Sequence, residues 1–215
     1  MQDFDWKQVR KNIRRTASFL QAYPNAKVMF VPVKSSVLSE KLPLFAQTEG
    51  EDRFMELAAK HIPDEQRIFM QDVLKAHQSE YIYYRTDHHW TTLGAYYAYE
   101  AWAESMGFSP VLKEEFQTAA ATDDFFGTTY AKVRTGGRAD TISLYERIDK
   151  TPYTIDYNMG EFQSDSFYDL SKAEGDDPYS VFFGGNQALA DIQMEKNPED
   201  GRTLLIVIDC FGNCF

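Results

Sequence analysis

The stretch YIYYRTDHHWTTLGAYYAYEAWAESMG, residues 81–107, places two of the chain's four histidines between an apolar run and a helical pattern. The apolar residues 81–84 predict a buried strand, and the residues after the histidines predict a helix to the end of the stretch. Polar side chains at the carboxyl end of a strand are where α/β proteins keep catalytic and binding groups. Asp87, His88 and His89 therefore form the first candidate site.

Two other apolar runs have the same character. Residues 27–33 and residues 204–208 each predict a buried strand. Helical patterns lie before the first run, at residues 3–22, and between the first two runs, at residues 53–62 and 67–77. Strands separated by helices predict an α/β fold with a mostly parallel sheet flanked by helices, whose functional loops gather at the carboxyl ends of the strands.

The region from residue 108 to residue 195 has a different pattern, in which short aromatic pieces alternate with Gly, Asp and Thr. This pattern favours β-structure and loops. We therefore expect residues 1–107 to form the first part of an α/β domain and residues 108–195 to form a β-rich insertion or cap. Residues 196–215 would add a returning core strand and the turn that follows it.

The composition is that of a globular protein and narrows the class of ligand. A length of 215 residues is enough for one domain with a full core. Asp and Glu outnumber Lys and Arg by 33 to 22, and the formal net charge of -11 argues against an extended nucleic-acid footprint. The aromatic share of 15% suits a sugar-stacking surface or an aromatic core.

Targeting signals and cysteine usage give few indications of cellular location. The sequence has no run of about 18 apolar residues and no basic start followed by an apolar stretch, so no transmembrane span or signal peptide is predicted. Its two cysteines, Cys210 and Cys214, form neither a disulfide framework nor a zinc-binding pattern. At this spacing we expect free thiols.

Asp87 and His89 are the most specific candidates for chemistry. In an extended segment residues i and i+2 point the same way, so the carboxylate can accept from the imidazole Nδ1 and orient a general base. His88 should then point to the opposite side, and we interpret it as structural. Cys210 follows a predicted buried strand, where a nucleophile is expected, and a helix beginning there would lower the pKa of its thiol.

Four motifs occur in an order that resembles a known family. They are TDHHW at residues 86–90, FFGTTYAK at 125–132, VFFGGN at 181–186 and LLIVIDCFGNCF at 204–215. The set is similar to the DHHW family, a branch of the SGNH-hydrolase-like group that includes the alginate O-acetyltransferases. The resemblance implies an SGNH-like fold and a triad in which Asp87 orients His89, His89 acts as general base and Cys210 stands at the position of the nucleophile.

Two features depart from that family's pattern. The family has serine in an Asp-Ser dipeptide after the strand, whereas this chain has Cys210 after Asp209. Cysteine is the stronger nucleophile, but a site shaped for a hydroxyl often handles a thiol poorly. The family also continues beyond this motif and carries an export signal or membrane anchor. We therefore expect a chain truncated at its C-terminus and a protein located at the bacterial cell surface or outside the cell.

The resemblance adds candidates for binding at residues 185 and 186, and the aromatic side chain of Trp90 is a further candidate. Gly185 and Asn186 would donate to an oxyanion or contact the substrate, although Gly184 and Gly185 form an equally good turn at the end of a strand. Trp90 would stack on a sugar ring or pack the helix against the sheet. Gly127, in FFGTTY, is interpreted as a turn or bulge.

A metal site is the main alternative for the histidines, because imidazole and carboxylate groups bind zinc and iron. Adjacent histidines on an extended chain diverge, however, and His61 and His77 lie in predicted helices without a matching spacing. We therefore expect neither a metal nor another cofactor.

The sequence thus predicts an SGNH-like esterase or O-acetyltransferase that acts on a bacterial cell-surface polysaccharide through a Ser(Cys)-His-Asp triad. Its partners would be a carbohydrate or acyl-donor substrate and a membrane-bound acyltransferase, and not nucleic acid. The alternative is a non-catalytic carbohydrate-binding or scaffold subunit of a polysaccharide-modifying assembly, which the missing serine and the aromatic content favour. A third hypothesis, cysteine-dependent hydrolysis or redox chemistry, depends on Cys210 alone.

Overall fold

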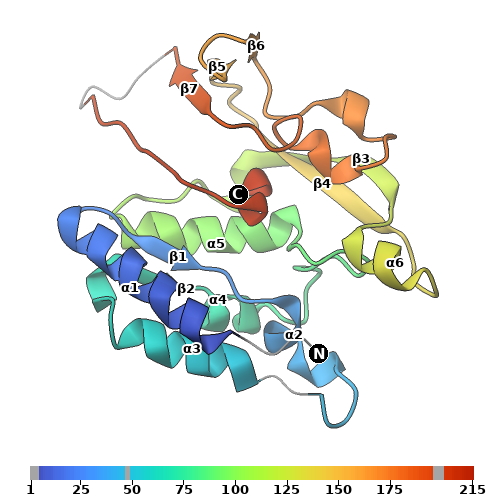
Figure 1. The fold of residues 1–215 in the computed structure, drawn as a ribbon. Coiled ribbons are helices and arrows are strands. Elements are labelled where there is room, and N and C mark those ends of the chain that lie inside the picture. Colours follow the sequence, from blue (N-terminus) through green and yellow to red (C-terminus); the bar gives the residue numbers. More distant parts are fainter. Residues whose placement is uncertain (1–4, 47–48, 196–200) are drawn as a thin grey trace. The chain divides into compact units, whose positions relative to one another are not determined.

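The computed structural model describes residues 5–46, 49–195 and 201–215 of the chain. These residues form a mixed α/β structure (Figure 1), as the sequence predicts. They divide into two compact units. Unit 1 comprises Met1–Glu80 and Tyr97–Ser109, and unit 2 comprises Tyr81–Tyr96 and Pro110–Phe215.

Unit 1 is built on a short parallel pair of strands. β1 (Val28–Phe30) pairs with β2 (Arg67–Phe69), with Met29 opposite Ile68. Helix α1 lies beside α3 in the same unit (Figure 1). The helices of this unit before residue 80 are α1 (Trp6–Ala22), α2 (Lys34–Val37), η1 (Ser39–Lys41), α3 (Glu49–Ala59), η2 (Asp64–Gln66) and α4 (Gln71–Ala76).

Two predicted elements of unit 1 differ in their bounds. The helix expected over residues 3–22 begins at Trp6, because the Asp5 side chain accepts hydrogen bonds from the first N–H groups of the helix; residues 3 and 4 lie outside the described residues. The stretch 67–77 was expected to be helical throughout, but its first residues form β2. A short apolar run fits a strand or a helix equally well, so periodicity could not separate the two.

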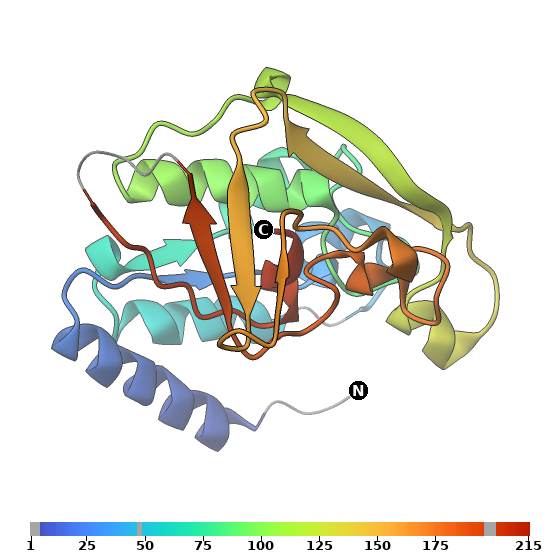
Figure 2. The ribbon, with the colours of Figure 1, turned by 90° about the horizontal axis from the view of Figure 1, so that it is seen from above.

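Unit 2 contains the antiparallel part of the structure. β3 (Phe116–Phe125) pairs with β4 (Asp140–Arg147), and β5 (Tyr153–Tyr157) lies between β6 (Phe162–Ser164) and β7 (Ala190–Met194), as Figure 2 shows. These strands supply the β-structure expected between residues 108 and 195. Because β1 and β2 are the only parallel pair in the described part of the chain, the expectation of a mostly parallel sheet is wrong for these residues.

The helices of unit 2 are short. They are η3 (Lys113–Glu115), α6 (Thr128–Val133), η4 (Leu170–Lys172), η5 (Pro178–Val181) and η6 (Cys210–Cys214). Two of them involve residues that the sequence marks as candidates for chemistry: η6 begins at Cys210, and the first residue of α6, Thr128, contacts Asp87.

Residues 81–84 are mostly buried, as expected, but they do not form a regular strand. Tyr83 makes an isolated antiparallel bridge with Trp90, and the Tyr84 N–H donates to the His89 carbonyl at 3.2 Å. The chain therefore turns back on itself around the histidines. Asp87, His88 and His89 lie on a tight loop rather than at the end of a parallel strand.

Helix α5 (Thr92–Ser105) follows this loop at the predicted place. The Thr91 hydroxyl accepts a hydrogen bond from the Gly94 N–H at 3.3 Å, and Gly107, with φ of 77°, lies in the left-handed conformation that ends a helix. Gly94 also has a packing role, since a Cβ at this position would overlap the Ile82 carbonyl oxygen. The absence of a side chain at residue 94 lets the first turn of the helix approach the loop.

The apolar run at residues 204–208 does not form the expected returning core strand. This segment has no strand pairing among the described residues, and the exposed fractions of Leu205 and Val207 are 80% and 87%. An apolar run becomes a buried strand only where another strand takes up its backbone N–H and C=O groups. No helix in the described part of the chain is both long enough and apolar enough to span a membrane.

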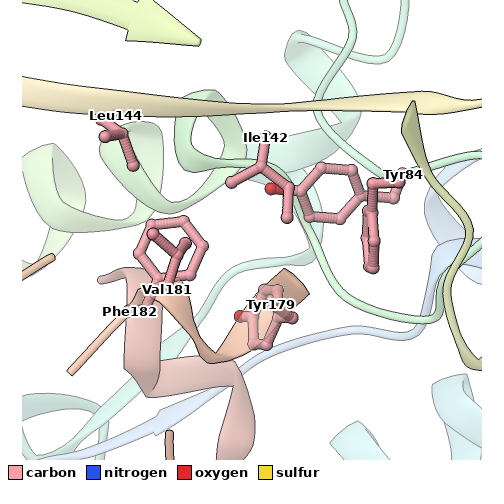
Figure 3. Close-up of a cluster of buried hydrophobic side chains, with 7 residues drawn as sticks. Tyr84, Ile142, Leu144, Tyr179, Val181 and Phe182 are labelled. Carbon is pink, nitrogen blue, oxygen red and sulfur yellow. The ribbon is translucent and has the colours of Figure 1, made fainter. Parts of the chain in front are cut away.

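The core of unit 2 is largely aromatic. Its buried members come from the segment before the histidines, from β3 and β4, and from η5 and the residue after it, and six of them are labelled in Figure 3. They are Tyr84, Phe125, Ile142, Leu144, Tyr179, Val181 and Phe182. Tyr84 packs edge to face on both Phe125 and Tyr179, with ring centroids 5.2 and 6.3 Å apart. This core fixes Tyr179 next to residues 85–89, which we call the histidine loop.

The close approach of α5 to the loop predicts the effect of Gly94→Ala. Alanine is the better helix former by about 1 kcal/mol. Because the new methyl group would overlap the Ile82 carbonyl, we nevertheless expect the free energy of unfolding to fall by about 1–3 kcal/mol. Urea denaturation followed by circular dichroism measures this change. Glu104→Ala, on the exposed side of the same helix, should stay within about 0.5 kcal/mol of the wild type, and an equally stable Gly94→Ala variant would contradict the packing argument.

Candidate functional site

The structure brings Asp87 and His89 together. The His89 Nδ1 atom lies 2.6 Å from Asp87 Oδ1, and the His89 backbone N–H donates to the same oxygen at 2.9 Å. The pair meets within a tight turn, in which the backbone bond closes an Asx-type loop. Nδ1 is thereby assigned as the protonated nitrogen, which leaves Nε2 as the reactive atom of the ring.

The other carboxylate oxygen of Asp87 is held by the start of α6. Thr128 donates to Asp87 Oδ2 from its backbone N–H at 2.7 Å and from its hydroxyl at 2.8 Å. Burial alone would raise the pKa of Asp87, but the hydrogen bonds from His89 and Thr128 outweigh burial and hold the pKa well below its usual range. Asp87 is therefore an ionised, fully oriented carboxylate.

Gly127 explains how the carboxylate fits there. A Cβ at position 127 would overlap the Cβ and Oδ2 atoms of Asp87. The φ of Gly127 is -90°, so its backbone conformation does not require glycine. The position is neither the turn nor the bulge that the sequence predicts; it is a point of close approach between backbone and side chain.

A second buried carboxylate fixes the other side of the loop. Asp140, at the start of β4, accepts hydrogen bonds from the backbone N–H groups of Arg85 and Thr86 at 2.8 and 2.7 Å. It also accepts from the Thr86 hydroxyl and from Tyr81. The loop from residue 85 to residue 89 is thus anchored at both ends by acidic side chains.

The His89 ring lies between two aromatic residues. Tyr179 stacks on it with centroids 4.2 Å apart and an interplanar angle of 3°, and Phe211 contacts it at 4.9 Å and 64°. The residue is 5% exposed, and its Nε2 atom has no hydrogen-bond partner among the described residues. A buried, unpartnered ring nitrogen is costly in a purely structural histidine, so this atom is available for a ligand or a proton.

His88 does not diverge from His89, and the expectation that it points to the opposite side is wrong. The two ring centroids are 3.7 Å apart. His88 Nδ1 lies 2.6 Å from the Thr128 hydroxyl, and His88 Nε2 lies 4.0 Å from Cys210 Sγ. The physical reason is the tight turn, which removes the alternation of side chains that an extended strand would impose.

Cys210 stands beside both histidines at the start of η6. One ligand atom from each of His88, His89 and Cys210 lies within 4.8 Å of the others. The Asp209 carboxylate caps η6 by accepting from the Phe211 N–H at 2.9 Å. Burial raises the pKa of the Cys210 thiol, and the nearby Asp209 charge raises it further. These two effects outweigh the lowering of the pKa by backbone N–H groups at the start of η6.

Trp90 is a support for η6 and does not bind substrate. Its side chain is fully buried, and its Nε1–H donates to the Phe211 carbonyl at 2.9 Å. The indole also packs edge to face on Phe211, with ring centroids 5.7 Å apart. The sugar-stacking interpretation of Trp90 is wrong because neither face of the ring reaches solvent.

Gly185 and Asn186 line the same cavity as Asp87 and His89. The Gly185 N–H donates to the Phe182 carbonyl at 3.0 Å with φ of 101°, so this N–H belongs to a turn and is not offered to an oxyanion. Asn186 Oδ1 accepts from Asn213 Nδ2 at 2.8 Å. The turn interpretation holds for Gly185, whereas the amide groups of Asn186 and Asn213 face the site.

These residues enclose a cavity of about 100 Å³ within unit 2. Its lining comes from the histidine loop, α6, η5, the Gly-Gly turn and η6. The lining residues are Asp87, His89, Thr128, Asp177, Tyr179, Ser180, Gly185, Asn186, Cys210 and Asn213. The cavity therefore joins a carboxylate-oriented imidazole, a thiol and amide groups, which is a combination suited to attack on an acyl group.

Several residues of the site were not foreseen. Thr128 and Phe211 lie inside the motifs FFGTTYAK and LLIVIDCFGNCF, so those motifs carried a signal for them. Tyr179 and Asp140 lie in stretches with no distinctive pattern, and only the fold brings them to the loop. Cys210 and Cys214 are free thiols, as expected; the Tyr179 hydroxyl lies 3.3 Å from Cys214 Sγ.

Comparison with known proteins supplies a family and a fold. The family described as DHHW protein matches residues 53–215. A DHHW family protein from Eubacterium siraeum superposes with a TM-score of 0.68 and 26% identity, over 94% of this chain and 70% of that one.

PatB1 from Bacillus cereus, solved with a sulfonyl adduct, gives a TM-score of 0.65 and 20% identity, over 89% of this chain and 67% of that one. A second structure of PatB1 gives a TM-score of 0.59 and 19% identity, over 82% and 64% of the two chains. The comparison with curated proteins gives no match.

The contact between Gly127 and Asp87 predicts the effect of Gly127→Ala. The added methyl group must displace the carboxylate and so break its bonds to Thr128. We expect the free energy of unfolding to fall by about 1–3 kcal/mol. The His89 Nδ1 proton should also lose the strongly downfield NMR signal of a carboxylate-bonded imidazole. Thr129→Ala, on the exposed side of α6, is the control and should change neither quantity. An unchanged imidazole signal in Gly127→Ala would show that the loop accommodates the methyl group.

Proposed function

The chain belongs to the DHHW family, and from this membership together with the site geometry we propose that it is an SGNH-like esterase or O-acetyltransferase. The observation that carries the proposal is the buried His89 Nε2 atom. It has no partner among the described residues, its ring is oriented by Asp87, and it lies beside the Cys210 thiol in a cavity. This is the arrangement of an activated nucleophile, in which a base is held by a carboxylate.

The first step would be acylation of Cys210. His89 Nε2 takes the proton from the thiol, the sulfur attacks the acyl carbonyl carbon, and the protonated imidazole returns the proton to the leaving alcohol oxygen. The raised pKa of the thiol makes this base necessary, because little thiolate forms without it at neutral pH. Asp87 stabilises the imidazolium that forms and keeps its ring in place.

The second step would transfer the acyl group. A sugar hydroxyl or water gives its proton to His89 Nε2 and attacks the thioester carbonyl, and the Cys210 sulfur leaves as the thiol after receiving the proton. The side-chain amide groups of Asn186 and Asn213, which line the cavity, are the candidates for stabilising the oxyanion in both steps. Attack by a sugar hydroxyl makes the protein a transferase, and attack by water makes it an esterase.

We place this activity at the bacterial cell surface, with a polysaccharide as acceptor and a membrane-bound acyltransferase as the supplier of acyl groups. The support is the likeness of the ordered motifs to those of the DHHW and alginate O-acetyltransferase group. No nucleic-acid role is proposed, because the net charge of -11 opposes binding to a phosphate backbone.

A non-catalytic carbohydrate-binding subunit is the second candidate. The raised pKa of Cys210 favours it, since an unreactive thiol at the serine position would leave a pocket without a nucleophile. Sugar binding that survives His89→Ala, with no acyl transfer in any variant, would support this alternative.

Acetylation of residue 210 is the direct test. The chain is first treated with a chelator to remove any adventitious metal and is then incubated with an activated acetyl ester. It should gain one acetyl group, and mass spectrometry of the digested chain should locate this group at Cys210. We expect His89→Ala to slow this acylation by about 100-fold or more, in line with the loss of a general base.

Two controls define the result. His61→Ala removes an exposed histidine of unit 1, outside the candidate site, and Cys214→Ser removes the other thiol; both should acylate at the wild-type rate. The catalytic proposal is rejected if neither the wild type nor Cys210→Ser forms an adduct at residue 210.

A further inference from the structure

We propose that His88 Nε2, His89 Nε2 and Cys210 Sγ bind one zinc-class transition-metal ion in the cavity. This inference goes beyond the proposed acyl transfer: it shares His89 and Cys210 with that mechanism but adds His88, and its test measures metal binding alone. It reverses the expectation of no metal, which relied on the two histidines diverging.

The ligand set is the first argument. One atom from each of the three side chains lies within 4.8 Å of the other two, and His88 Nε2 is 4.0 Å from Cys210 Sγ. In a tetrahedral zinc site neighbouring nitrogen and sulfur ligands are about 3.5 Å apart. Side-chain rotations alone can close the remaining difference, and His88, with 47% of its side chain exposed, has room to move.

The outer hydrogen bonds of the two imidazoles are the second argument. His89 Nδ1 is bonded to the Asp87 carboxylate and His88 Nδ1 to the Thr128 hydroxyl, each at 2.6 Å. Metal-binding histidines almost always donate their other ring N–H in this way, which fixes the tautomer and the ring direction. Each ring thus has Nε2 as the nitrogen that can bind a metal, and His88 Nε2 lies 4.0 Å from Cys210 Sγ.

The unpartnered His89 Nε2 atom is the third argument. The residue is 95% buried, and among the described residues nothing satisfies this nitrogen, although it borders the cavity. An electrophile in the cavity would satisfy it, and two imidazoles with a thiolate are a set that zinc-class ions prefer over magnesium or calcium.

The cysteine at position 210 makes this site a stronger metal site than the family's serine would. A serine hydroxyl is a poor ligand for zinc-class ions, whereas a thiol binds as the thiolate and releases its proton to solvent. Three protein ligands leave a fourth position open to the cavity, which is the pattern of a site that exchanges a bound ligand. A bound ion would occupy the same sulfur and nitrogen that acyl transfer needs, so the metal-loaded chain should not be acylated.

Cobalt titration tests the proposal without reference to activity. The chain, freed of metal by a chelator and reduced, is titrated with Co²⁺. We expect one ion per chain and a near-ultraviolet thiolate-to-cobalt absorption band, which added Zn²⁺ removes by displacement. Zn²⁺ should also slow iodoacetamide labelling of Cys210 in the wild-type chain.

Variants assign the ligands. Cys210→Ser should lose the band, while the matched control Cys214→Ser should keep it. His88→Ala should weaken Zn²⁺ binding by at least tenfold. Thr128→Val removes the hydroxyl that bonds to His88 Nδ1 and to Asp87 Oδ2, and it should weaken binding by about 10- to 100-fold. His61→Ala should bind as the wild type. Circular dichroism spectra confirm that each variant is folded.

Three results would overturn the proposal: no cobalt band in the wild type, a band that survives Cys210→Ser, or unchanged Zn²⁺ affinity in His88→Ala. The acetylation experiment is run on metal-free chain, so its outcome is independent. Metal binding with no acetyl adduct in either the wild type or Cys210→Ser would reject the proposed enzyme and keep the metal site. Acetylation without metal binding would do the reverse.

Discussion

The buried carboxylate of Asp87 is the interaction on which the rest of the site depends. It accepts hydrogen bonds from both the backbone and the side chain of His89 and of Thr128, and so joins the histidine loop to the start of α6. A buried charge is tolerated only when its acceptor sites are filled. The missing side chain at Gly127 and the hydroxyl of Thr128 both serve to accommodate this charge, which in turn fixes the imidazole.

Aromatic residues also hold the His89 ring in place. Tyr179 belongs to the core cluster of unit 2 and stacks on His89. Phe211, whose carbonyl accepts a hydrogen bond from Trp90, also contacts the His89 ring. The His89 Nε2 and Cys210 Sγ atoms can serve either in proton transfer during acylation or in metal binding, and each use excludes the other. The residue at position 210 sets the balance between them, because sulfur serves either purpose and a hydroxyl oxygen serves only the first.

The sequence was informative where chemistry depends on neighbours along the chain. The meeting of Asp87 with His89, the helix that follows and the strand at residues 28–30 all follow from local spacing. The direction of His88 did not, because it depends on whether the loop is extended or folded back. The burial of Trp90 and the stacking of Tyr179 on His89 depend on partners about 90 to 120 residues away. Strand partners are equally non-local, which is why residues 204–208 look like a core strand and are not one in this structure.

The exposed run Leu204–Ile208 has a consequence for the behaviour of the chain in solution. Five consecutive apolar residues of high β-propensity, without charge or proline, have the composition of segments that pair between molecules and start cross-β aggregates. Arg202 and Asp209 flank the run as charged residues that oppose such pairing. Repulsion between molecules of net charge -11 is the other protection, and it weakens as salt screens the charges. Added salt should therefore favour association of the chain through this run, even where the fold itself is unaffected.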